Sequence, residues 1–341
     1  MKNVSIVNRL HKDKLSRSFE YLRISVTDRC NYRCSYCMPS EIFNKNYNYI
    51  SQDKILSYEE IIKIVFILKK LGLKKVRLTG GEPLIRKNID KLIGKLKTEA
   101  KIEHVSMTTN GSLLTDDKLL DLKKSGLDSL TLSLDTLTPD KINQINGTKK
   151  QLNIIKVLNG IEKYFGLVKT NTVLIKGVND DEIFDIIDLV KKFKSEIRFI
   201  EYMDVGESHD WNLKKVIPTK DLINQIRRSH DLEAIESEKS STSKRWKIKN
   251  TNTALGFISS ITEPFCSDCN RARLSVDGKL FTCLFATDGH DLKEMLRSNE
   301  SDHKILNYFQ EIWRNRSDRY SEIRFTKKEN LPKVEMSYIG G

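Results

Sequence analysis

Residues 30–37 read CNYRCSYC and contain three cysteines at the spacing CxxxCxxC. The residues before them, YLRISV at 21–26, alternate in polarity and therefore predict a β-strand. A strand that leads directly into a cysteine loop indicates a cofactor site at the mouth of a sheet. Three thiolates with no adjacent fourth ligand hold an iron–sulfur cluster and leave one coordination position open for chemistry.

The composition is typical of a globular protein. The chain has 341 residues, 38% of them hydrophobic and 31% charged, which is enough for one large domain and a smaller one. Residues 1–19 are a polar, basic arm without periodicity, so we expect a loose, poorly ordered segment except where it is tied down. Charges run throughout the first twenty residues, so we also expect no signal peptide. The most apolar helix candidate, residues 61–68, is interrupted by Lys63, so we expect no membrane span and a cytoplasmic location.

The net charge of +13 suggests an anionic partner such as a nucleotide, a nucleic acid or a lipid headgroup. The same charge has a simpler explanation, because abundant lysine, asparagine and isoleucine with scarce alanine and proline also follow from A+T-rich codon usage. Basicity alone therefore identifies no ligand, and an anionic ligand has to be inferred from the positions of individual arginines.

A regular alternation of strands and helices follows the cysteine loop. Further strand patterns lie at 75–79, 105–108, 129–134, 167–175 and 197–202, with helical patterns between them. Six β units joined by helices indicate parallel βαβ construction. The predicted fold class is α/β, a partial (β/α)6 barrel over residues 14–232, followed by a smaller α+β domain over 233–341. In such barrels the functional groups lie at the C-terminal ends of the strands, so those ends should converge on one mouth.

The six cysteines fall into two groups of three, one near each end of the chain. Disulfides are one interpretation, but an odd number per group in a cytosolic protein favours metal sites. For the first group, zinc would need a fourth protein ligand, and CxxxCxxC is not a usual zinc spacing. The turn Gly80–Pro83 favours iron–sulfur, because two glycines allow close approach to a ligand and Glu82 can accept hydrogen bonds from an ammonium group.

The second group supplies three thiolates from Cys266, Cys269 and Cys283. A structural zinc completed by His290 is one alternative, and an open metal site is the other. Arg271 and Arg273 lie between the second and third cysteines, and both face one side if residues 272–275 form a strand. Such a guanidinium pair favours a phosphate or purine ligand; the alternative is two solvated surface arginines.

The cysteine loop and the Gly80–Pro83 turn together resemble the radical S-adenosylmethionine superfamily. The resemblance implies a [4Fe–4S] cluster on Cys30, Cys34 and Cys37 whose open iron binds S-adenosylmethionine. One electron from that cluster then splits S-adenosylmethionine and yields a 5′-deoxyadenosyl radical. The residues implied to contact S-adenosylmethionine are Tyr36, Gly81, Ser133 and Met203.

The run from Phe265 to Leu284 resembles the GTP 3′,8-cyclase family of molybdenum cofactor biosynthesis. Residues 28–31, residues 199–203 and the terminal Gly340-Gly341 match that family as well, so the resemblance spans nearly the whole chain. It implies a lyase with a second [4Fe–4S] cluster, on the second cysteine group, that binds the guanine of GTP. The GTP contacts that it implies are Arg23, Arg77, Thr108, Lys169, Arg271 and Arg273.

The implied reaction converts GTP to (8S)-3′,8-cyclo-7,8-dihydroguanosine 5′-triphosphate, with the cysteines of the first cluster, Arg271 and Arg273 as catalytic groups. The implied partners are a downstream cyclic pyranopterin monophosphate synthase and an electron donor such as flavodoxin or ferredoxin, with no nucleic acid and no membrane. The family also implies that Gly340-Gly341 inserts toward the active site. Thr170 departs from the aliphatic residue usual beside Lys169.

The residues leave two other functions open. One is a radical enzyme that modifies peptides and carries an auxiliary cluster, and the other is a zinc-bearing nucleic-acid-binding protein. The sequence also leaves the oligomeric state open, a homodimer included.

Overall fold

The computed structural model describes residues 12–236, 240–325 and 333–341. Six central strands are β1 (Tyr21–Ser25), β2 (Lys75–Thr79), β3 (His104–Thr109), β4 (Ser129–Ser133), β5 (Val168–Leu174) and β6 (Ser195–Glu201). The helices between them are α2 (Tyr58–Lys69), α3 (Ile89–Thr98), α4 (Asp116–Lys124), α5 (Pro139–Asn146), α6 (Ile154–Phe165) and α7 (Ile183–Val190). All neighbouring pairs from β1 to β6 are parallel, which confirms the predicted βαβ construction.

The C-terminal part contributes shorter elements. Its strands are β7 (Leu232–Ile235), β8 (Lys244–Ile248), β9 (Thr253–Ile258), β10 (Arg271–Leu274), β11 (Lys279–Phe281) and β12 (His290–Asp291). Its helices are α8 (Thr219–Arg227), α9 (Leu292–Arg297), α10 (Asp302–Asn315), α11 (Tyr320–Ile323) and α12 (Met336–Ile339). None of the helices in the described part of the chain combines the length and the apolar character that crossing a bilayer requires.

Both edges of the central sheet are extended by C-terminal strands. The described strands form one sheet in the order β12-β11-β10-β1-β2-β3-β4-β5-β6-β9-β8-β7. Strand β10 pairs parallel to β1, and β9 pairs parallel to β6, so the backbone groups of both edges are satisfied. The predicted domain boundary falls at the first residue of β7, and the division into two domains stays a prediction.

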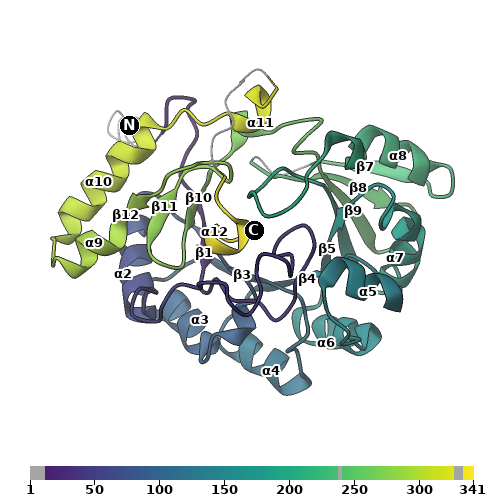
Figure 1. The fold of residues 1–341 in the computed structure, drawn as a ribbon, viewed down its shortest axis with the longest axis horizontal. Helices are drawn as coiled ribbons and strands as arrows, with labels where there is room; N and C mark the ends of the chain where they lie inside the picture. The colour runs from purple at the N-terminus through teal and green to yellow at the C-terminus, as the bar shows by residue number, and fades with distance from the viewer. Residues whose placement is uncertain (1–11, 237–239, 326–332) are drawn as a thin grey trace.

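The sheet curves around an interior, as Figure 1 shows, with helices α3, α4, α6 and α7 outside it and α12 with the C-terminus inside it. Local chemistry explains why the outer helices form where they do. Helix α2, for example, begins with a reciprocal cap: Glu60 N donates to Ser57 Oγ at 3.1 Å, and Ser57 N donates to the Glu60 carboxylate at 2.7 Å. Its side chains Ile61, Ile64 and Leu68 are fully buried in the core, while Phe66 on the opposite side is exposed.

The start of the described chain differs from the predicted loose arm. Asp13 and Arg17 are buried, and Trp313 Nε1 on α10 donates to the Arg17 carbonyl at 3.1 Å. The ring of Phe19 lies 4.7 Å from that of Phe309 and 5.1 Å from that of Trp313, centroid to centroid. Residues 12–19 are therefore fixed against α10. The buried carboxylate of Asp13 pairs with Arg17 and with the distant Arg316, a partner that the local sequence does not reveal. Residues 1–11 lie outside the described part.

A buried glutamate joins the end of β6 to the C-terminal elements. One carboxylate oxygen of Glu201 accepts from Thr219 N at 3.0 Å and Thr219 Oγ1 at 2.9 Å. The other accepts from Ile261 N at 2.8 Å and Thr262 N at 2.9 Å. The side chain therefore fixes the start of α8 and the loop after β9 to the central barrel.

We expect Glu201→Ala to lower the free energy of unfolding of the metal-free protein by about 3 kcal/mol, because hydrogen bonds to a buried carboxylate are lost and their donors stay unsatisfied. Urea denaturation followed by circular dichroism measures this. The control is Glu263→Ala, which removes an exposed carboxylate paired with Lys244 at 2.6 Å and should cost less than about 1 kcal/mol. Equal effects of the two substitutions would contradict the assigned role of Glu201.

Candidate functional site

A cavity of about 820 Å³ occupies the interior of the sheet. It reaches from the loop that carries the first cysteine group to the turn that carries the second. Side chains of β1 to β6 line its wall, together with β10 and the C-terminus. Every site residue predicted from the sequence lines this one cavity: Arg23, Cys30, Cys34, Tyr36, Cys37, Arg77, Gly81, Thr108, Ser133, Lys169, Met203, Cys266, Cys269, Arg271, Arg273 and Cys283.

The alternation of the strands decides which side chains enter the cavity. On β5, Lys169, Asn171 and Val173 line it, while Thr170 between them is fully buried on the opposite face. The Thr170 hydroxyl has no hydrogen-bond partner within the described residues. The unusual threonine therefore leaves Lys169 facing the interior, as expected, and places an unsatisfied hydroxyl behind it.

The three thiols of the first cysteine group are half-buried and lie in a weakly polar setting. Tyr32 N and Asn146 Nδ2 approach the sulfurs of Cys30 and Cys34, each at 3.4 Å. Burial raises the pKa of the Cys30 thiol to about 11 and also raises the pKa values of Cys34 and Cys37. A bound metal deprotonates such thiols outright, so this set of three thiols suits an iron–sulfur cluster with one open iron.

Gly81 allows the Gly80–Pro83 turn to pack against the cysteine loop. Its N–H donates to the Thr27 carbonyl at 2.7 Å, and the Glu82 N–H donates to the Arg29 carbonyl at 2.9 Å. A Cβ atom at Gly81 would lie 2.1 Å from the Arg29 carbonyl oxygen. The glycine is therefore required by contact with the backbone next to Cys30, in addition to any contact with a ligand.

The Glu82 carboxylate is bonded to the end of β3. It accepts from Thr109 Oγ1 at 2.7 Å, Asn110 N at 2.8 Å and Leu84 N at 3.1 Å. Burial raises its pKa to about 7, against the lowering effect of these hydrogen bonds. Glu82 therefore joins the Gly80–Pro83 turn to the turn after β3, and its expected hydrogen bond from the ammonium group of a ligand stays a prediction.

Tyr36 is held by a residue that sequence reasoning missed. Its hydroxyl donates to Asp135 Oδ2 at 2.7 Å, and Asp135 Oδ1 accepts from Val173 N at 2.9 Å. Asp135 is buried directly after β4. The sequence held one signal that could have identified Asp135, namely its position two residues beyond Ser133, just after the C-terminal end of a strand.

The second cysteine group lies in a cationic setting. Cys266 begins the 3-10 turn Cys266–Asp268, Cys269 follows that turn, and Cys283 follows β11. Burial alone would raise the pKa of the Cys269 thiol, but the guanidinium groups of Arg271 and Arg316 outweigh it and lower that pKa to about 6. Burial raises the pKa of Cys283 to about 12. One thiolate is thus favoured before any metal binds.

The zinc alternative with His290 finds no support in this geometry. His290 lies on β12, exposed and absent from the cavity wall, with its ring 6.2 Å from that of Tyr308. Among the described residues, no three His, Cys, Asp or Glu side chains form a ligand set for a single metal ion. Three cysteines with arginines beside them fit a larger, anionic cluster better than an isolated zinc ion.

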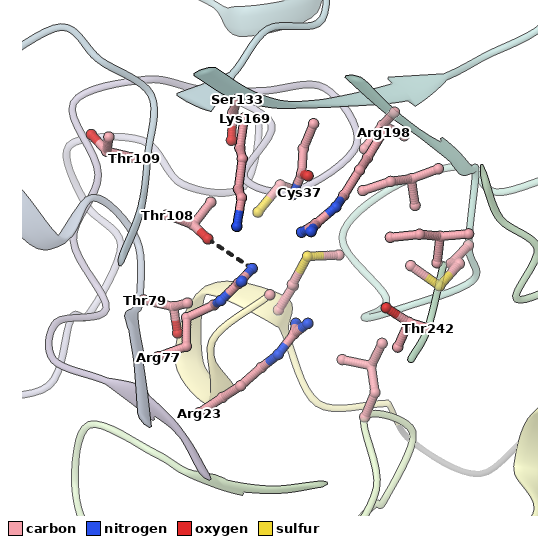
Figure 2. A pocket seen from close by; sticks show the side chains of 18 of the residues that line it. Arg23, Cys37, Arg77, Thr79, Thr108, Thr109, Ser133, Lys169, Arg198 and Thr242 are labelled. Atoms are coloured by element: carbon pink, nitrogen blue, oxygen red, sulfur yellow. Dashed lines mark hydrogen bonds between the residues drawn. The ribbon is translucent and has the colours of Figure 1, made fainter. Parts of the chain in front are cut away.

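Cations gather in the middle of the cavity. Figure 2 shows the side chains of Arg23, Arg77, Lys169 and Arg198 extending toward one another. The strand register sets Arg77 and Arg273 on either side of Arg23, on β2, β10 and β1. Neighbouring like charges on adjacent strands repel each other, so an anion bound here would relieve the repulsion.

Two properties of Arg23 support an anion site here. Burial, and then the neighbouring guanidinium of Arg77, lowers the pKa of Arg23 to about 10. Arg23 Nε is buried without a hydrogen-bond partner in the described part of the chain.

Arg198 also lines the cavity, although it was not predicted from the sequence. Its alternation with Glu196 and Ile200 on β6 marks the three as cavity-facing. Glu196 accepts from Arg198 Nε at 2.6 Å and offsets one of the charges.

The C-terminus enters the same cavity. The Gly340 carbonyl accepts from Arg273 Nη1, and Ser25 Oγ donates to the Ser337 carbonyl at 3.2 Å. Gly340 has a φ of +77°, and a Cβ atom there would lie 2.1 Å from Thr79 Oγ1. Gly341 lines the cavity. The tail is therefore seated beside β1 and β2 and is not frayed.

Comparisons with known proteins match both parts of the chain. Residues 24–190 match the Radical SAM superfamily, and residues 195–322 match Molybdenum Cofactor Synthesis C. The chain is 42% identical to a GTP 3′,8-cyclase of Aquifex aeolicus over 332 residues, which cover 96% of this chain and 99% of that protein. It is 40% identical to a GTP 3′,8-cyclase of Staphylococcus haemolyticus over 340 residues, covering 97% and 98%.

A solved structure resembles the fold. SuiB of Streptococcus suis, crystallised with S-adenosylmethionine, superposes with a TM-score of 0.61 over 96% of this chain and 72% of SuiB. The two sequences are 17% identical, so the likeness shows the fold alone.

Tyr21 reports the charge of the cavity. Burial would raise its pKa, but Arg77 and Arg23 outweigh burial and lower that pKa to about 8. We expect one tyrosine of the metal-free protein to lose its proton near pH 8 in an ultraviolet absorbance titration, and Tyr21→Phe to remove that step. Tyr58→Phe is the control, because burial raises the pKa of Tyr58 to about 12. A step near pH 8 that persists in Tyr21→Phe would contradict the assignment.

Proposed function

Because the chain belongs to the GTP 3′,8-cyclase family of radical S-adenosylmethionine enzymes, we propose that its cavity holds S-adenosylmethionine at the first cysteine group and GTP between the two groups. The family acts in molybdenum cofactor biosynthesis, and its radical domain uses a [4Fe–4S] cluster with S-adenosylmethionine. The reaction is the cyclisation of GTP to (8S)-3′,8-cyclo-7,8-dihydroguanosine 5′-triphosphate. The observation that carries the proposal is a single cavity with three cysteines at each end and a row of arginines between them.

The first end is the S-adenosylmethionine site. Bound there on the cluster of Cys30, Cys34 and Cys37, S-adenosylmethionine supplies a carbon radical that abstracts hydrogen. Tyr36, held by Asp135, contacts the adenine end, and Gly81 borders the methionine end. Ser133 and Met203, from the ends of β4 and β6, complete the contacts.

The middle of the cavity binds the polyanion. Arg23, Arg77 and Lys169 supply charge from three strands, and the Thr108 hydroxyl accepts from Arg77 Nη1 at 3.4 Å and so orients it. Charge-assisted hydrogen bonds from a guanidinium to phosphate are strong and directional. Arg198 lines the same wall and joins this set.

The second end binds the guanine. We propose a second [4Fe–4S] cluster on Cys266, Cys269 and Cys283, with Arg271 and Arg273 beside its open position. The low pKa of the Cys269 thiol and the lack of a fourth ligand from His290 support this fit. Arg273 also holds the Gly340 carbonyl, so the tail borders the substrate and helps to exclude water from it.

The remaining partners follow from the reaction. The product would pass to a cyclic pyranopterin monophosphate synthase, and the first cluster would receive its electron from a flavodoxin or a ferredoxin. Reduced clusters and GTP both suit the cytoplasm. A homodimer is compatible with the proposal and is not required by it, since the residues named above come from one chain.

The function is tested on anaerobically reconstituted protein with GTP, S-adenosylmethionine and a reductant. We expect 5′-deoxyadenosine together with a cyclised nucleotide. Cys283→Ser should retain part of the S-adenosylmethionine cleavage and lose the cyclisation, because it alters the second group alone. If the wild-type protein forms neither product, the function is wrong. If Cys283→Ser abolishes cleavage while the first cluster is intact, the two ends do not divide the work as proposed.

Arg271→Ala should weaken GTP binding about thirtyfold, since a lost charged hydrogen-bond donor to the bound nucleotide costs about 2 kcal/mol. Calorimetry on the anaerobic protein measures the affinity, and iron analysis accompanies it. The control is Arg297→Ala, which removes an exposed arginine of α9. Arg297 pairs with Glu60 at 2.7 Å, and its loss should leave the GTP affinity unchanged. Loss of iron in Arg271→Ala would instead make Arg271 a structural residue.

A further inference from the structure

We propose that Arg316 and Arg17, joined by Asp13, are positioning residues for the second cysteine group, and that Arg316 donates a hydrogen bond to the Cys269 sulfur of the bound cluster. The inference rests on the second cluster proposed above. It concerns three residues that neither the motifs nor the comparisons single out, and two of them lie in the segment expected to be a loose arm.

Arg316 holds Cys269 at two atoms. Its Nη1 donates to the Cys269 carbonyl at 2.7 Å, and its Nη2 donates to the Cys269 sulfur at 3.4 Å. The side chain is 1% exposed, and the guanidinium lies 4.5 Å from the centre of the Trp313 ring. The planar fork of the guanidinium thus fixes the main chain and the sulfur of one cysteine together.

Arg17 holds the main chain of the preceding cysteine, Cys266. Its Nη1 donates to the Cys266 carbonyl at 2.7 Å and to the Asp318 carbonyl at 2.8 Å, across more than two hundred residues of sequence. Its Nη2 is buried and has no hydrogen-bond partner in the part of the chain that the structure describes. The N–H groups of Arg17 Nη2 therefore remain available to a group that this part of the chain does not supply.

Asp13 links the two arginines. One of its carboxylate oxygens accepts from Arg17 Nε at 2.5 Å and from Arg316 Nη1 at 3.3 Å, and its side chain is 0% exposed. The Asp318 carboxylate, which is partly exposed, accepts from Arg316 Nε at 3.2 Å. Two guanidinium groups and two carboxylates thus surround the cysteine turn, and the directions of both arginines are fixed.

Stability does not explain such a network. Taking these charges out of water is costly, and apolar side chains of similar volume would often serve equally well. Positioning does explain it, because residues that hydrogen-bond to metal ligands fix the ligands and tune the metal. The first cysteine group differs, since its sulfurs meet asparagine side chains and a backbone N–H at 3.4 Å or more. A charged donor to the sulfur is found at the second group.

A hydrogen bond from a cation to a cluster sulfur favours the reduced, more negative cluster and so raises its midpoint potential. The test isolates the second cluster by replacing Cys30, Cys34 and Cys37 with serine in the full chain. In this background, iron and acid-labile sulfide after anaerobic reconstitution report on the second site, where we expect about four iron atoms per chain. Two readouts follow: the midpoint potential and the rate of iron loss to a chelator.

In that background, Arg316→Met should lower the midpoint potential and speed iron loss about tenfold, in line with the usual cost of losing a group behind a metal ligand. Arg316→Lys keeps the charge but cannot hold both atoms of Cys269, so it should be intermediate in both readouts. The matched control is Arg314→Met, which replaces an exposed arginine near the end of α10, the helix that Arg316 follows. It should change neither the midpoint potential nor the rate of iron loss.

The outcomes separate the two proposals. If the background protein with Arg316 intact binds no iron–sulfur cluster, the second cluster itself is wrong and this inference falls with it. If the cluster forms but Arg316→Met and Arg316→Lys retain the wild-type potential and rate, Arg316 does not position the site. Should Arg316→Met fail to fold, Arg316→Lys carries the test, because a mere requirement for a buried cation would leave its potential and rate unchanged.

Discussion

The row of arginines across β2, β1 and β10 is the constraint on which the rest of the site depends. Arg77 and Arg273 flank Arg23 in register, and burial together with mutual repulsion makes this row unfavourable by itself. Strand pairing and the hydrophobic layer beneath keep the arginines together, at a cost that a bound anion would offset. The protein thus maintains an unsatisfied positive site, the condition that tight binding of a triphosphate requires.

The same pairing brings the two cysteine groups to one cavity. Strand β10 ends the segment that carries Cys266 and Cys269, and its parallel register with β1 aligns that segment with the strand leading to Cys30. The surroundings of the two groups differ in kind. At the first, burial keeps the thiol pKa values high, whereas at the second two guanidinium groups lower the pKa of Cys269. Different environments suit two clusters with different tasks, one proposed to generate the radical and one proposed to hold the substrate.

Both ends of the described chain contribute to the site. Gly340 meets Arg273 within the cavity, and Asp13 and Arg17 lie behind the second cysteine turn. Neither segment has a regular apolar pattern that would announce a buried position. Each is fixed by polar contacts to residues far away in the sequence.

The sequence by itself determined the six βα units, because an apolar pattern of period 2 or 3.6 reports which faces are buried. It also predicted a cofactor site at each group of three cysteines. It placed the two arginines of β10 on one face, because side chains alternate along a strand. Residue spacing cannot report which edge a distant strand will join, because that choice depends on pairing between segments some 250 residues apart, such as Arg23 and Arg273. Only the tertiary structure therefore decided that C-terminal strands extend both edges of the central sheet and that Glu82 bonds to β3. It alone also decided that Asp13, Arg17 and Arg316 meet behind Cys269. These contacts are satisfied through space, and a charged side chain shows no local sign of the partner that makes its burial possible.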